Sequence, residues 1–70
     1  MFTFTDKFGY QVYVKPETIT AVEHNKNDTA HRVTIFSSAS VWDYEPSSEE
    51  DCRSFLFSLF KAMGEEYRYE

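Results

Sequence analysis

The chain has 70 residues, a single cysteine and a formal net charge of −5. This length fits one domain (residues 1–70) with a small core, and one cysteine excludes an intrachain disulfide, as is usual in a reducing cytoplasm. With 7 Lys and Arg against 12 Asp and Glu, the composition argues against sequence-independent binding to nucleic acid and to anionic membranes. The opening MFTFTDKFG lacks the features of a signal peptide, so we expect a cytoplasmic protein.

The first two predicted strands cover residues 2–5 and 10–14, where apolar and polar side chains alternate. Residues 6–9 between them are turn formers and end in Gly9, so we expect a β-hairpin. Pro16 ends the second strand because it has no N–H to donate.

Three further strands are predicted at residues 19–24, 31–37 and 40–45. The first two of these flank the polar segment 24–30 and should form a second hairpin. In the last strand, alternation places Trp42 and Tyr44 on one face, with Val41 and its alternate neighbours on the other.

A helix is predicted over residues 48–63, with Ser47 and Glu50 as a capping box. Gly64 is a typical residue for ending a helix. Residues 65–70 are predicted to be a frayed tail, unless Tyr67 and Tyr69 pack against the domain. Apolar residues recur at helical spacing and form one core stripe: Cys52, Phe55, Leu56, Leu59, Phe60 and Met63.

The order of five strands and then one helix predicts an α+β fold. We expect a five-stranded, curved antiparallel sheet, a β-meander, with the C-terminal amphipathic helix over one face. A barrel-like curl of the sheet is the alternative, because it buries more aromatic surface than a flat sheet.

The segment FGYQVYVKPETITAVE, followed by a hairpin, VWDYE and a short helix, resembles the small FlbD-like proteins and many phage-encoded proteins of this size. Their pattern P-x-x-I-x-x-V/I-E is matched here by Pro16, Ile19, Val22 and Glu23. The resemblance implies a compact, strand-rich domain without catalytic machinery, and it assigns no functional residues. The aromatic residues are more numerous here than in that pattern.

His24 and His31 flank the second predicted turn and can face each other across the hairpin. With Glu23 or Asp28 they would offer three metal ligands, but no third ligand has a diagnostic spacing. We therefore expect two exposed histidines, no metal and no cofactor.

Cys52 lies in the first turn of the predicted helix, where the helix dipole lowers a thiol pKa. The acidic residues beside it oppose thiolate formation, and Cys52 also begins the core stripe. We expect a buried, inert cysteine rather than a nucleophile, and no catalytic residues.

Acidic residues gather around the junction between the last strand and the helix. They are interpreted as a solvated face or as a rim that meets a basic partner. This acidic rim consists of Asp43, Glu45, Glu49, Glu50 and Asp51.

The 7 Phe, 5 Tyr and 1 Trp are more aromatic side chains than one helix can cover. Phe57 lies outside the core stripe, and one face of the sheet must remain without a helix. The candidate partner-binding residues are Tyr13, Phe36, Trp42, Tyr44 and Phe57.

The leading hypothesis is a non-enzymatic protein-binding module or accessory regulator that forms a homodimer. One alternative is an acidic inhibitor that imitates nucleic acid. Another is a nucleotide- or single-strand-binding domain that stacks bases on Trp42, Tyr44 and Tyr13. The shortage of basic residues weighs against this last alternative.

Overall fold

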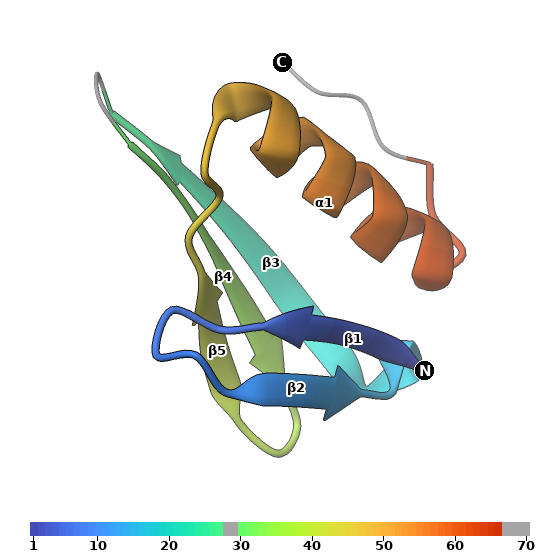
Figure 1. Ribbon diagram of the computed structural model, residues 1–70. Helices are drawn as coiled ribbons and strands as arrows, with labels where there is room; N and C mark the ends of the chain where they lie inside the picture. The colour runs from blue at the N-terminus through green and yellow to red at the C-terminus, as the bar shows by residue number, and fades with distance from the viewer. Residues whose placement is uncertain (28–29, 67–70) are drawn as a thin grey trace.

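The computed structural model describes residues 1–27 and 30–66, which form five antiparallel strands and one C-terminal helix (Figure 1). The predicted α+β fold is confirmed, and the strand ranges agree with the prediction to within two residues. The elements are β1 (Phe2–Thr5), β2 (Gln11–Val14), the 3₁₀ turn η1 (Pro16–Thr18), β3 (Ile19–Lys26), β4 (His31–Ser37), β5 (Val41–Tyr44) and α1 (Glu49–Ala62). Tyr67 and Tyr69 lie outside the described residues.

The five strands divide into two sheets, β1–β2 and β3–β4–β5, in place of the single curved sheet that we expected. The sheets are not closed into a barrel. The physical reason lies at η1, where Pro16 interrupts the extended chain and the Thr18 N–H donates to the Lys15 carbonyl at 2.9 Å. This turn redirects the chain, so that β3 pairs with β4 and not with β2.

The β1–β2 hairpin is closed by the side chain of Asp6. One carboxylate oxygen of Asp6 accepts hydrogen bonds from the backbone N–H groups of Phe8 and Tyr10, at 3.0 and 2.9 Å. Gly9 has a φ of 87°, a left-handed conformation that other residues adopt only with strain. The turn is attached to the second sheet, because the Lys7 N–H donates to the Asp43 carbonyl at 3.0 Å.

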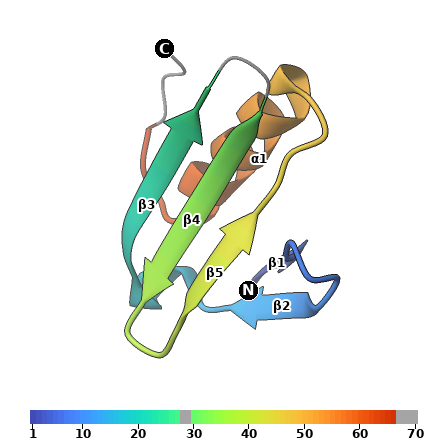
Figure 2. The same cartoon turned by 90° about the vertical axis from the view of Figure 1, so that its left-hand side faces the viewer.

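The helix α1 and the β1–β2 hairpin pack on the same side of the three-stranded sheet. Figure 2 shows this sheet from the opposite side, with α1 behind it. Phe4 of β1 joins the layers, since its ring packs edge-on against Trp42, Tyr44 and Phe55. The buried hydrophobic core is formed by Phe4, Val12, Val14, Val33, Ile35, Cys52, Phe55, Leu56 and Leu59.

The start of α1 differs by one residue from the prediction. Ser48, and not Ser47, is the N-cap, and its hydroxyl accepts from the Asp51 N–H at 3.0 Å. The Asp51 carboxylate in turn accepts from the Ser47 N–H at 2.9 Å. The predicted pairing of Ser47 with Glu50 is therefore wrong, because Asp51 supplies the carboxylate that reaches back to the preceding backbone.

The apolar stripe of α1 packs as predicted. Four of its members are buried, and Phe60 and Met63 are half-buried at its end. Gly64 follows the helix with a φ of 78°, consistent with its predicted role. Among the described residues, no helix is both long and apolar enough to cross a membrane.

Candidate functional site

Two of the five predicted partner-binding residues are largely exposed. Tyr13 has 67% of its surface accessible and Phe57 has 57%. Tyr13 points outward because its neighbours Val12 and Val14 on β2 are both buried in the core. Phe57 lies off the buried stripe of α1, as its helical position predicts.

Trp42 and Tyr44 lie on the core-facing side of the three-stranded sheet, next to the buried residues Ile35 and Val33 of β4. Both are half-buried and pack against the core through Phe4. The Tyr44 ring also stacks on Phe55 with a centroid distance of 3.9 Å. Phe36 is half-buried on the face of β4 that lies away from Val33 and Ile35. The structure therefore does not bring the five aromatic residues onto one surface.

Most carboxylates of the acidic rim have partners within the chain. Lys7 pairs with Asp43 at 3.3 Å, and the Thr34 hydroxyl donates to the same carboxylate at 2.7 Å. The Thr34 hydrogen bond, with help from Lys7, holds the pKa of Asp43 below its usual value, although desolvation opposes the shift. The other partnered members are Glu45 with Arg32, Glu49 with Lys26, and Asp51 with Ser47 and Tyr44.

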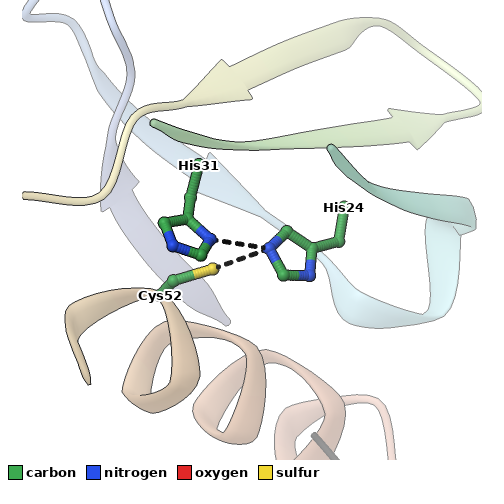
Figure 3. A group of neighbouring side chains, drawn as sticks. All are labelled: His24, His31 and Cys52. Carbon is green, nitrogen blue, oxygen red and sulfur yellow. Dashed lines mark hydrogen bonds between the residues drawn. The ribbon is translucent and has the colours of Figure 1, made fainter. Parts of the chain in front are cut away.

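A different group of side chains comes together beneath the start of α1. His24 of β3 lies opposite Val33 and His31 of β4 lies opposite Lys26, so the histidines are diagonal neighbours on one face. Val33 is fully buried, which identifies this face as the one that α1 covers. Cys52, in the first turn of α1, is buried and its sulfur points toward the two rings (Figure 3).

The ligand atoms of these three residues lie close to one another. His24 Nε2 is 3.2 Å from His31 Nδ1 and 3.3 Å from Cys52 Sγ. All three atoms lie within 4.8 Å of one another. The imidazole rings are stacked, with centroids 5.4 Å apart and planes inclined by 19°. We call this group the His–His–Cys cluster.

Burial shifts the pKa values of two members of the His–His–Cys cluster, His24 and Cys52. Desolvation, with smaller contributions from His31 and Lys26, lowers the pKa of His24 and favours its neutral form. Desolvation also raises the pKa of the Cys52 thiol, and the charges of Asp51 and Glu49 add to this shift. Cys52 is fully buried, which confirms its predicted place in the core.

Two members of this cluster were predicted to lie near each other, and the third was not. His24 and His31 were expected across a hairpin, with Glu23 or Asp28 as a further ligand. Glu23 is exposed and accepts from the Asn25 amide at 3.2 Å, and Asp28 lies outside the described residues. The histidines are half-buried rather than exposed, which corrects that expectation. The available signal was the position of Cys52 at the head of the core stripe.

No protein-family model, curated protein or solved structure matches the chain. These comparisons neither support nor contradict the resemblance to the FlbD-like proteins.

Proposed function

We propose that the chain is a small, non-enzymatic protein-binding module that self-associates through the exposed face of α1. The observation that carries the proposal is the exposure of Phe57, a large apolar side chain that the domain's own core does not cover. Phenylalanine at the centre of an interface contributes strongly to binding because it removes a large apolar area from water.

The surroundings of Phe57 favour a second copy of this chain as the partner. Phe57 borders a surface hollow of about 490 Å³, which Lys61, Gly64, Glu65 and Glu66 also line. A two-fold arrangement would insert each Phe57 into the hollow of the other copy. It would also set Lys61 of one copy against the acidic residues of the other, so the patch is complementary to itself.

Self-association is tested by sedimentation equilibrium across the micromolar range. Wild type should dimerise, and Phe57→Ser should weaken the dimer at least about 10-fold, as expected for a central aromatic residue. Phe8→Ser is the matched control, because Phe8 is exposed to 74% in the β1–β2 turn and lies outside this patch. It should leave the dissociation constant unchanged.

A charge exchange tests the geometry of the interface. Lys61→Glu alone should weaken association, and adding Glu65→Lys should restore it, because the exchange re-creates opposite charges across the two-fold axis. A wild-type chain that remains monomeric at every concentration contradicts the proposal. Equal weakening by Phe57→Ser and Phe8→Ser contradicts the assignment to α1.

The nucleic-acid alternatives receive less support from the side-chain positions. Base stacking would use Trp42, Tyr44 and Tyr13, and the first two pack against the core. Imitation of nucleic acid needs an array of available carboxylates, whereas most of the acidic rim is engaged within the chain. As part of the proposal we place the module in the cytoplasm, because its one cysteine is typical of a reducing compartment.

A further inference from the structure

We infer that His24, His31 and Cys52 form a binding site for a Zn²⁺ ion, with one nitrogen from each histidine and the cysteine sulfur as ligands. Imidazole nitrogen and thiolate sulfur are the ligands that zinc prefers in proteins. The three side chains come from β3, β4 and α1, so one ion would connect all three elements.

Two of the three distances between the ligand atoms are close to those of a tetrahedral zinc site. With Zn–N near 2.1 Å and Zn–S near 2.3 Å, tetrahedral ligands stand about 3.4 Å (N to N) and about 3.6 Å (N to S) apart. The corresponding distances here are 3.2 Å between the histidine nitrogens and 3.3 Å from His24 Nε2 to the sulfur. The remaining pair, His31 and the sulfur, lies within 4.8 Å, and a side-chain rotation would bring it to the tetrahedral spacing.

Hydrogen bonding alone satisfies this arrangement poorly. His24 Nε2 contacts both His31 Nδ1 and Cys52 Sγ, yet a neutral imidazole nitrogen carries either one hydrogen or one lone pair. It therefore makes one good hydrogen bond at a time, and the second contact competes with the first. A cation between the three atoms accepts a lone pair from each of them.

The donor set favours zinc over hard cations. Mg²⁺ and Ca²⁺ select oxygen ligands, whereas one sulfur and two imidazole nitrogens suit a borderline or soft ion. Binding replaces the thiol proton by a Zn–S bond, and this proton leaves to solvent. The described residues supply three ligands, and water takes the fourth position of the tetrahedron.

The half-buried histidines connect the cluster to solvent. His31 also lines a surface hollow of about 410 Å³, together with residues such as Arg32 and Glu45. An ion can thus enter from the end of the β3–β4 hairpin. A metal here would stabilise a domain of 70 residues, whose core is small, by joining α1 to the hairpin.

The test uses untagged protein purified with a chelator, because a polyhistidine tag would itself bind metal. Titration with Co²⁺ should give the visible bands of tetrahedral cobalt and a near-ultraviolet thiolate-to-cobalt band, saturating at one ion per chain. Zn²⁺ should displace the cobalt and abolish both signals. Zinc at 100 times its dissociation constant should raise the thermal midpoint by about 10 °C or more.

Variants identify the ligands. Cys52→Ala should abolish the thiolate band and weaken zinc binding at least about 100-fold, and His31→Gln should weaken binding similarly. Glu50→Gln is the matched control, because it removes an exposed carboxylate from the same helical turn and should leave affinity unchanged. Circular dichroism establishes that each variant folds. His31→Gln keeps the test decisive if Cys52→Ala does not fold.

Three results would overturn the inference. The first is the absence of micromolar zinc binding by the folded wild type. The second is a cobalt spectrum without the thiolate band, which indicates binding elsewhere on the acidic surface. The third is saturation at one ion per two chains, which indicates a site shared between copies. None of these results depends on Phe57, so the zinc site and the self-association are tested separately.

Discussion

At the scale of single residues, Tyr44 illustrates how one side chain serves both packing and hydrogen bonding. Its ring stacks on Phe55, and its hydroxyl donates to the Asp51 carboxylate at 2.9 Å. Burial, followed by the hydrogen bond and the negative charge of Asp51, raises the pKa of Tyr44 to about 12. The residue therefore joins the end of β5 to the first turn of α1.

The raised pKa of Tyr44 predicts a loss of stability in alkaline solution. Below pH 10 the tyrosine is protonated in both states, so its contribution to stability is fully present. As pH rises from 10 to about 12, the unfolded chain loses this proton first, and the free energy of unfolding falls. Urea unfolding at pH 9 to 11 should show a steeper fall for wild type than for Tyr44→Phe.

Near neutral pH, Tyr44→Phe retains the ring and should cost about 1 kcal/mol through the lost hydrogen bond. Parallel pH profiles for the two proteins would contradict the assignment of this proton to Tyr44. The comparison with the variant removes the contribution of lysines, which titrate in the same range in both proteins.

At the scale of elements, the start of α1 is set by competition between two overlapping capping patterns. Ser47 with Glu50 and Ser48 with Asp51 have the same spacing, and both are compatible with an N-cap. The structure uses the second pair. The Tyr44 hydroxyl holds Asp51 in place, so a tertiary contact selects between two locally equivalent starts.

The choice of cap predicts unequal effects of two neighbouring substitutions. Ser48→Ala removes the acceptor for the Asp51 N–H and should destabilise the protein by about 1 kcal/mol. Ser47→Ala keeps its backbone N–H, loses only a hydroxyl contact of 3.4 Å and should cost less. Urea unfolding of both variants measures the difference. A larger loss for Ser47→Ala would place the cap at Ser47.

At the scale of the whole molecule, stability depends on a single core between the three-stranded sheet and its two covers. Leu59 is fully buried, whereas Phe57, two residues earlier on the same helix, is mostly exposed. The same helix thus presents one face to the core and another to solvent. A substitution on each face separates the stability of the fold from the proposed binding function.

Leu59→Ala should lower the free energy of unfolding by about 2–5 kcal/mol, because it leaves a cavity in a closely packed core. For a domain of 70 residues this is a large share of the total stability. Phe57→Ala should change monomer stability by about 0.5 kcal/mol or less, as for other surface positions. Denaturation at protein concentrations below the dimer range measures both, and comparable losses would mean that Phe57 belongs to the core.

The aromatic residues of β5 show that a local pattern does not predict which face of a strand is buried. Alternation along β5 separates Trp42 and Tyr44 from Val41 and Asp43. It does not indicate which of these two pairs faces the core. The larger aromatic pair faces the core because the β1–β2 hairpin brings Phe4 over that side. The division into two sheets was equally beyond the pattern, since Pro16 marks an interruption without saying which strands pair afterwards.

The sequence by itself determined the strands, the two hairpins, the helix and the exposure of Phe57, because each depends on periodicity and turn chemistry within a few residues. Tertiary structure alone decided that Cys52 contacts His24, 28 positions earlier. That contact depends on where α1 crosses the β3–β4 hairpin. The crossing point is set by packing of the whole core, which no local pattern of residues encodes.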